Sequence, residues 1–301
     1  MTPFDRPAFA LPPVADRVGP FPHGEFLSTV WNHTADPADE LMIAHDTSGL
    51  VGMACVGGSW MLAGSGDLVD YRSPLGTGIP ELVAGAVRSL GAGASFSFDS
   101  LPAEAAETIA AGLDLAGVKA EVAQHAVAAV LHLPDTFDDY LALIGKKERH
   151  ELRRKRRRYE AALGEARFVH HVGTGPVFDD FVRLHRLAHG DKGGFMTEEM
   201  ESMFADLACL PGWGIDALVA DDGHVTAAGF GYMDDDGYYL YNSAYNPELS
   251  DASPGVVLLG RLIELSIERG KRVFDFLKGD EHYKYRLGAV ARPLFEIEGR
   301  T

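Results

Sequence analysis

Nine of the chain's 27 Lys and Arg residues lie together in Lys146–Arg158, which has the sequence KKERHELRRKRRR. The whole chain carries a net charge of −17, so this segment concentrates positive charge in an acidic protein. Guanidinium groups bind phosphates through paired hydrogen bonds. The segment therefore predicts an anion site, with Arg153, Arg154 and Arg157 as candidates. A solvated connecting helix and a clamp for the acidic surface are the alternatives.

A second candidate anion site lies at a predicted helix start. We expect a helix over Pro254–Arg269, because Ser253 suits an N-cap and Gly270 suits the left-handed position after the last turn. Backbone N–H groups at such a start lack partners within the helix, and the helix dipole adds partial positive charge. A pyrophosphate or carboxylate can bind there. The cofactor-binding candidates are Ser253, Gly255, Val256 and Val257; an ordinary surface cap is the alternative.

Polar residues also follow the two strands that flank this helix. Tyr238–Ser243 and Arg272–Leu277 are expected strands, and with the helix they form a βαβ unit. Loops at the carboxyl ends of such strands commonly hold ligands. The substrate-binding candidates are Tyr241, Asn242, Tyr245, Asp275 and Glu281, and Asp280 is a catalytic candidate that can orient an amine. Packing of the tyrosines against the sheet and capping of the next turn by Asp280 are the alternatives.

The elements that position these residues occur twice in the chain. Leu41–Ala54 can be aligned with Ala217–Phe230, and Gly93–Pro102 can be aligned with Gly270–Asp280. Each half contains two strands joined by a tight turn, then a loop, a helix and a strand. This order predicts a duplicated α/β domain, and a chance similarity of architecture is the alternative.

A helical connector separates the two halves. Thr136 and Asp139 form a predicted capping box, Gly145 interrupts the helix, and a second, basic helix runs to about Leu163. We therefore predict an N-terminal domain over residues 1–134, a basic helical connector over 135–165 and a C-terminal domain over 166–301.

Composition argues against several classes of protein. The 301 residues contain no apolar run long enough to span a membrane, and the N-terminus lacks the pattern of a signal peptide. The only cysteines are Cys55 and Cys209, so buried thiols in a cytoplasmic protein are expected rather than disulfides. The paired histidines have no acidic or Cys partner, so we expect no metal site. The negative charge argues against general nucleic-acid binding.

Three motifs carry a resemblance to a known family. They are KKERHELRRKRRR, YLYNSAYNPELSDASPG at Tyr239–Gly255 and FDFLKGDEHYKYRLG at Phe274–Gly288. In this order they resemble tandem GNAT-fold acyltransferases of the CelD/BioF2-like acetyltransferase branch, which is related to the Fem-type peptidyltransferases. The resemblance extends from about Leu41 and implies two GNAT-like domains, each a mixed, largely antiparallel sheet flanked by helices.

The resemblance implies an N-acyltransferase that moves an acyl group from acetyl-CoA or another acyl-CoA to a small-molecule amine, without a covalent enzyme intermediate. Tyr283–Gly288 matches the aromatic-Lys-x-x-x-Gly pattern of Fem-type domains. By this resemblance Lys284 stabilises an oxyanion or a phosphate, and Tyr283 or Tyr285 protonates the leaving group.

The sequence departs from ordinary GNAT enzymes at the phosphate loop. Ser253-Pro254-Gly255-Val256-Val257 replaces the usual glycine-rich Q/R-x-x-G-x-G/A. In the Fem-type branch the donor is an aminoacyl-tRNA, so an aminoacyl-tRNA-dependent, Fem-like transferase is the first alternative. A non-catalytic module that binds an anionic partner through the basic helix is the second.

Overall fold

In the computed structural model, which describes residues 3–64 and 66–301, the chain forms two compact units. The N-terminal unit contains Met1–Ala128 and Arg292–Thr301, and the C-terminal unit contains Ala129–Ala291. These boundaries differ from the predicted ranges in two places. The basic segment belongs to the C-terminal unit because its helix packs there, and residues 292–301 belong to the N-terminal unit because their strand pairs with a strand of that unit.

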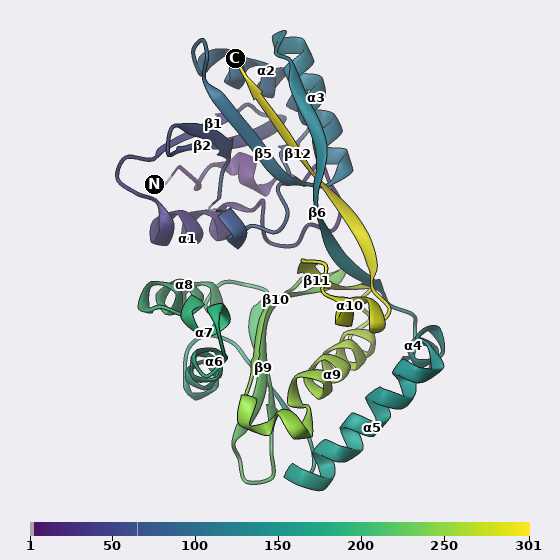
Figure 1. Cartoon of the computed structure of the whole chain (residues 1–301). Coiled ribbons are helices and arrows are strands. Elements are labelled where there is room, and N and C mark those ends of the chain that lie inside the picture. The colour runs from purple at the N-terminus through teal and green to yellow at the C-terminus, as the bar shows by residue number, and fades with distance from the viewer. Residues whose placement is uncertain (1–2, 65) are drawn as a thin grey trace. The chain divides into compact units, whose positions relative to one another are not determined.

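The N-terminal unit combines a sheet with a pair of packed helices (Figure 1). Its sheet order is β1-β2-β3-β5-β12-β6, with β4 paired to β2. β1–β2, β2–β3 and β5–β12 are antiparallel, whereas β3–β5 is parallel. Its elements are η1 (Pro7–Ala10), α1 (Gly24–Thr34), β1 (Glu40–His45), β2 (Gly49–Val56), β3 (Ser59–Leu62), η2 (Gly66–Leu68), β4 (Leu75–Gly76), α2 (Ile79–Ser89), β5 (Ser95–Leu101), α3 (Ala103–Ala116) and most of β6 (Ala120–His132) and β12 (Val290–Arg300).

The C-terminal unit is a sheet with helices on both faces. Its sheet order is β6-β11-β10-β9-β8-β7, in which β6 contributes its last residues. The pairs β7–β8, β8–β9 and β9–β10 are antiparallel, and β10–β11 is parallel. Its elements are α4 (Phe137–Leu143), α5 (Lys146–Leu163), β7 (Arg167–His171), α6 (Pro176–Arg186), α7 (Asp191–Phe195), α8 (Glu198–Ala208), β8 (Trp213–Val219), β9 (Val225–Met233), β10 (Gly237–Tyr245), η3 (Pro247–Ala252), α9 (Pro254–Glu268), β11 (Val273–Lys278) and α10 (His282–Arg286).

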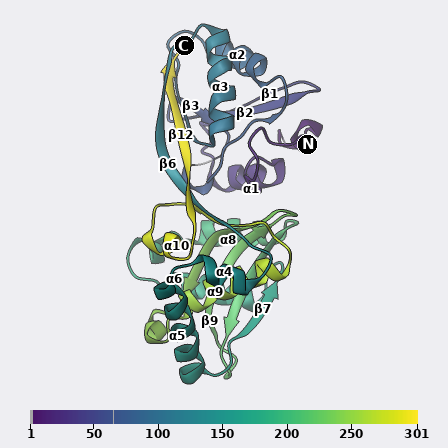
Figure 2. The same ribbon diagram turned by 90° about the vertical axis from the view of Figure 1, so that its right-hand side faces the viewer.

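Helix α9 is central to the core of the C-terminal unit. It packs on β8 to β11, α5 packs on its outer side, and α6 covers the opposite face of the sheet (Figures 1 and 2). Leu258, Leu262 and Ile263 of α9 are almost fully buried at helical spacing. The basic helix α5 is anchored by Tyr159, which is fully buried and whose hydroxyl lies 2.8 Å from Thr226 Oγ1. Burial of one face therefore holds α5 in place while its charged residues remain outside.

Strands β10 and β11 separate after a short paired stretch. Their parallel register runs from Gly237↔Val273 to Tyr239↔Asp275 and ends there. Strand β10 then shifts its register against β9 between Leu240 and Asn242, as a β-bulge does. The separation leaves a wedge between the later parts of the two strands, and α9 begins beside its mouth.

The predicted fold class is confirmed as α/β, with mostly antiparallel pairing and flanking helices. Both units contain antiparallel strands followed by a helix and a strand that pairs in parallel, β3 with β5 and β10 with β11. The duplication that this order suggests stays a prediction.

Two local expectations from the sequence are wrong, and one is confirmed. Ser253 makes no capping hydrogen bond, because its backbone is left-handed with φ 59° and follows directly on η3. Cys209 is exposed rather than buried, at the end of α8. Gly270 does take the left-handed position after α9, with φ 71°.

Candidate active site

A cavity of about 340 Å³ opens in the C-terminal unit where β10 ends and α9 begins. We call it the wedge cavity; its walls come from α5, the end of β10, η3, the start of α9 and Tyr283 of α10, the helix that follows β11. Its walls are mainly apolar, with one cation and several hydroxyl groups. The lining residues are Lys155, Ser243, Ala244, Tyr245, Ser250, Ser253, Gly255, Val256, Leu258, Leu259 and Tyr283. Tyr245, Ser253, Gly255, Val256 and Tyr283 are thus the candidates from the sequence that the fold brings together here.

Gly255 makes room for an aromatic ring at the start of α9. A Cβ atom added to Gly255 would lie 3.1 Å from Tyr245 Cδ1, which is a tight contact. The ring of Tyr245 therefore lies against the first turn of the helix and forms one wall of the cavity. The absence of a side chain at Gly255 therefore allows the ring of Tyr245 to pack closely against the helix, whether or not a ligand is bound.

Two of the backbone N–H groups in the first turn of α9 already have an acceptor within the protein. The N–H groups of Val256 and Val257 both donate to the Ser253 carbonyl, at 3.1 and 3.2 Å. Among the described residues, the Gly255 N–H has no acceptor and lies at the cavity wall. The positive end of the helix dipole thus faces the cavity with one available amide, fewer than a glycine-rich phosphate loop presents.

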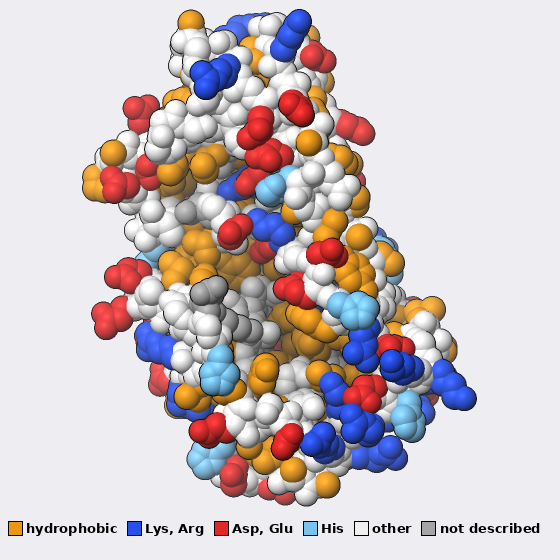
Figure 3. Space-filling view, viewed as in Figure 1, with side chains coloured by type: hydrophobic (Ala, Val, Ile, Leu, Met, Phe, Trp, Pro, Cys, Tyr) orange, Lys and Arg blue, Asp and Glu red, His pale blue; other side chains and the backbone are white. Residues whose placement is uncertain are grey.

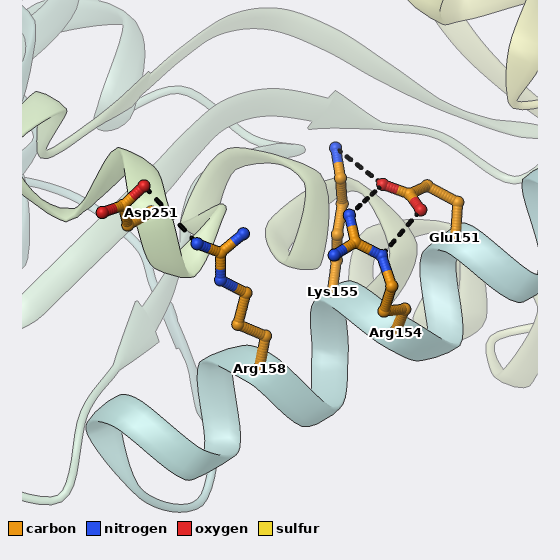
Figure 4. A network of polar contacts seen from close by, with 5 residues as sticks. All are labelled: Glu151, Arg154, Lys155, Arg158 and Asp251. Atoms are coloured by element: carbon orange, nitrogen blue, oxygen red, sulfur yellow. Dashed lines mark hydrogen bonds and ion pairs between the residues drawn. The ribbon is translucent and has the colours of Figure 1, made fainter.

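Lys155 is the cation of the wedge cavity, and the sequence did not single it out. It lies three residues after Leu152 and four before Tyr159, so helical spacing places it beside the buried face of α5. That spacing is the signal that would have identified it. Its Nζ is 3.9 Å from Glu151 Oε1, a long contact that leaves the ammonium available (Figure 4).

Glu151 interacts with two cations of α5, Arg154 and Lys155. It accepts two hydrogen bonds from Arg154, at 2.9 Å from Nε and 2.7 Å from Nη2 (Figure 4). These bonds, with the charges of Arg154, Lys155 and Arg286, lower the pKa of Glu151 to about 2. Because the carboxylate stays ionised, it holds the Arg154 guanidinium away from other anions.

The three arginines predicted to hold a cofactor do not line the wedge cavity. Arg154 is paired with Glu151, and Arg157 is exposed. Arg153 borders two other hollows of the surface, and Val257 borders one of these. In Figure 3 the basic side chains gather on the lower right of the visible face, where α5 lies in Figure 1. Most of the basic residues of α5 therefore lie outside the wedge cavity, which Lys155 alone of them lines.

Lys284 is almost fully buried at the loop that follows β11. It is 3% exposed, and its Nζ donates to the carbonyls of Leu277, Lys278 and Gly279 at 3.4, 3.1 and 3.3 Å. It also forms an ion pair with Glu281 at 2.8 Å. An ammonium has three protons, so these acceptors use its full capacity. Lys284 and Glu281 together hold the loop after β11.

The two tyrosines around Lys284 have different positions. Tyr283 lines the wedge cavity and is 43% exposed, and burial, aided by the charge of Glu281, raises its pKa to about 12. Tyr285 donates to Asp280 at 2.6 Å, and this hydrogen bond raises its pKa to about 12. Both phenols therefore keep their protons at neutral pH. Only Tyr283 presents its proton to the cavity.

Three predicted substrate-binding residues have structural contacts outside the cavity. Tyr241 packs in an aromatic cluster, with ring centroids 5.5 Å from Phe204 and 5.3 Å from Trp213. Asn242 Oδ1 accepts from His185 Nε2 at 3.0 Å and from the Ser243 N–H at 2.7 Å, which fixes the bulge of β10.

Asp275 is a buried residue in the middle of β11. It is 1% exposed and accepts from the Leu277 N–H at 2.7 Å, where Leu277 has the left-handed φ of 62°. Alternation along the strand directs Phe274 and Phe276 to the other face, as the sequence predicted, and their ring centroids are 4.8 Å apart. Asp275 therefore fixes the backbone of β11 at Leu277 and is not among the residues that line the wedge cavity.

A model of the acetyltransferase (GNAT) domain family matches residues 146–285. The matched residues all lie within the C-terminal unit. This match includes α5, the wedge cavity and the loop held by Lys284, and it confirms the prediction of a GNAT-class transferase. A comparison with curated proteins found no match.

Solved structures similar to this chain agree in fold along almost its whole length. L-PGS from Bacillus licheniformis is 15% identical with a TM-score of 0.58, covering 95% of this chain and 94% of its own. FemX is 10% identical with a TM-score of 0.62, covering 96% and 93%. The C-terminal domain of a protein described as a lysylphosphatidylglycerol synthetase, from Agrobacterium fabrum, is 13% identical with a TM-score of 0.57, covering 91% of each. Such identities show a shared fold, and the CelD/BioF2 branch stays a prediction.

Within residues 3–64 and 66–301, no group of three or more His, Cys, Asp or Glu side chains is arranged to hold a metal ion. No helix in that part of the chain has the length and apolar character needed to cross a membrane.

Proposed function

We propose that the GNAT domain transfers an acyl group from a phosphate-bearing carrier to a small-molecule amine, with no covalent enzyme intermediate. The observation that carries this proposal is the wedge between β10 and β11. Backbone groups beyond Tyr239 and Asp275 are not used in pairing between these two strands, so an extended acyl arm can bind between them. The arm would then end at the wedge cavity, beside the start of α9.

The residues of the cavity support a direct transfer. The amine nitrogen attacks the carbonyl carbon, and the bond from that carbon to the carrier breaks. Lys155 and the positive end of α9, with the Gly255 N–H, stabilise the negative charge that grows on the carbonyl oxygen. Tyr283 supplies a proton to the leaving group and regains one from the amine. Lys284 and Asn242 position the loop and the strand that form the wedge.

Acyl-CoA is the proposed donor, in agreement with the description of the matching family as an acetyltransferase. In this proposal Lys155 and the start of α9 contact the thioester carbonyl of the donor. The predicted cytoplasmic location fits such a donor and stays a prediction.

An aminoacyl-tRNA is the second candidate donor, and two observations on the structure support it. The 18-residue helix α5 is about 27 Å long at 1.5 Å per residue, and its cations extend well beyond the cavity. The first turn of α9 also offers a single free amide rather than a phosphate loop. The printed name of one structural neighbour, lysylphosphatidylglycerol synthetase, contains a lysyl group, which is an aminoacyl group.

The donor can be tested by binding and turnover with two variants. Wild-type protein, Lys155→Met and Arg157→Met would each be titrated with acetyl-CoA and with a mixture of aminoacyl-tRNAs, then assayed against a panel of amines. Loss of the Lys155 contact is expected to weaken either donor about tenfold or more. Loss of Arg157, which lies outside the cavity, is expected to weaken only tRNA.

The dependence of binding on the two residues distinguishes the donors. Binding of acetyl-CoA that depends on Lys155 alone supports the first donor, and binding of tRNA that depends on both residues supports the second. Anion binding without turnover of either donor would leave the non-catalytic module. Donor binding that is unchanged in Lys155→Met would remove the wedge cavity from the proposal.

A further inference from the structure

A second cavity, of about 210 Å³, lies between α4, α5 and α9 of the C-terminal unit. We call it the arginine cavity. It is on the other side of α5 from Lys155, because Lys155 and Arg156 flank Leu152 at helical spacing. Its lining residues are Phe137, Leu141, Leu152, Arg153, Arg156, Val256, Val257, Gly260, Arg261 and Glu264. The proposed transfer reaction uses no side chain of this cavity apart from Val256, which borders both cavities.

The floor of the arginine cavity is apolar and is kept open by a glycine. Phe137, Leu141, Leu152 and Val257 supply carbon surface. A Cβ atom at Gly260 would meet only Leu152 Cδ2, at 3.7 Å, which is an ordinary contact. Packing therefore does not require glycine there, although glycine in a helix interior is unfavourable relative to alanine. Its effect is to leave free volume, which water fills poorly where walls are apolar.

The rim of the cavity carries an excess of positive charge. Arg261 pairs with Glu264, and Arg156 is shared between Glu160 at 3.0 Å and Glu264 at 3.7 Å. Arg153 has no ion pair among the described residues, and Arg261 Nε is buried without a hydrogen-bond acceptor in that part of the chain. An apolar pocket thus ends at one free guanidinium and one unused buried donor.

We infer that the arginine cavity binds the alkyl chain of a fatty acid and that Arg153 and Arg261 hold its carboxylate. The cavity of about 210 Å³ has room for part of an alkyl chain along its apolar floor. The charge favours an anionic head, since a carboxylate satisfies the Arg261 Nε donor and pairs with Arg153. The carboxylate of Glu264 stays neutralised by its own two arginines.

Calorimetric titration of the full chain with three probes tests the chain and the head group separately. Decanoate has both features, decanol has the chain alone and acetate has the carboxylate alone, each used below any concentration that forms micelles. We expect saturable one-to-one binding of decanoate, with decanol at least about tenfold weaker and acetate undetectable. Equal binding of decanol and decanoate would overturn the role of the arginines, and no binding of decanoate would overturn the proposal.

Matched variants locate the site. Arg153→Gln and Arg261→Gln should each weaken decanoate about tenfold and leave decanol unchanged, while Arg157→Gln, on the exposed side of the same helix, should change neither. Gly260→Leu should remove binding of both probes by filling the cavity. If Gly260→Leu does not fold, the arginine variants still decide the matter. Decanoate affinity that falls equally in Arg157→Gln and Arg153→Gln would show general attraction to α5 rather than a site.

Discussion

Replacement of Lys284 by methionine should destabilise the C-terminal unit, because this side chain holds the loop after β11. Its ammonium donates to three consecutive carbonyls, from Leu277 to Gly279, and pairs with Glu281. The loop has left-handed backbone at Leu277, with φ 62°, and at Gly279, with φ 124°. Methionine fills a similar volume and donates no hydrogen bond, so the carbonyls lose their partner.

The expected cost is about 3 kcal/mol of unfolding free energy. Each hydrogen bond to a charged group contributes about 1.5–3 kcal/mol, but the three distances of 3.1–3.4 Å are long and the effects are not additive. Breaking a buried charged contact typically costs about 3–5 kcal/mol. Glu281 is 56% exposed and shares its charge with solvent, so the lower end applies. For a unit of this size the loss corresponds to a fall in Tm of roughly 6–12 °C.

Tryptophan fluorescence can report this unit alone. The chain has three tryptophans, and only Trp213 lies in the C-terminal unit, where it is 3% exposed. In a background of Trp31→Phe and Trp60→Phe, urea unfolding followed at Trp213 gives the free energy of that unit. Glu281→Gln is the matched control, because it removes the ion pair and leaves the three carbonyl contacts. It should cost less than about 0.5 kcal/mol.

A loss below about 1 kcal/mol in Lys284→Met would refute the structural role. So would equal losses in the two variants, because the ion pair would then account for the whole effect. If Lys284→Met is as stable as wild type but inactive once a substrate is known, the oxyanion role implied by the family resemblance would be restored.

Three further outcomes are expected. Gly231→Ala should cost about 1–3 kcal/mol in urea unfolding, because the new Cβ would lie 2.6 Å from Cζ of the buried Tyr238. Burial first, and then the charge of Asp216, raises the pKa of Tyr238 well above its usual 10. The folded state therefore keeps a proton that the unfolded state loses, so stability should be flat below about pH 10 and fall above it; Tyr238→Phe should make that fall shallower. Glu151→Gln should strengthen binding of the phosphate-bearing donor several-fold in titrations, because it frees Arg154 and removes a negative charge close to Lys155.

Sequence periodicity was sufficient for the elements that surround the site. The βαβ unit appears as β10, α9 and β11 within a few residues of its predicted bounds, because apolar spacing, Pro254 and Gly270 each act locally. The positions of Tyr245, Gly255 and Tyr283 around one cavity follow from that unit and from the loop after it.

The roles of individual polar residues did not follow from the sequence, because they depend on contacts across elements. Lys284 is committed to carbonyls of a loop whose left-handed turns no propensity indicates. Arg154 forms an ion pair with Glu151, a partner that a run of basic residues does not indicate. Lys155, the cation that lines the wedge cavity, was not distinguished from the arginines around it. Asn242 reaches His185 only because β10 bulges, which a uniform strand pattern cannot reveal.

The order in which the units can be completed during synthesis is the reverse of their order in the chain. The C-terminal unit is a continuous stretch, Ala129–Ala291, whereas the N-terminal unit needs Arg292–Thr301 as well. Strand β12 pairs with β5 from Phe295↔Leu101 to Arg300↔Ser95, and Arg292 donates to the Asp16 and Arg17 carbonyls at 2.8 Å. A nascent chain that has reached residue 291 thus contains every residue of the C-terminal unit. At that stage β12 has not been made, so the edge of β5 that pairs with it is exposed. Truncation at that point would keep every residue of the C-terminal unit and would leave the N-terminal unit without β12, open to aggregation and proteolysis.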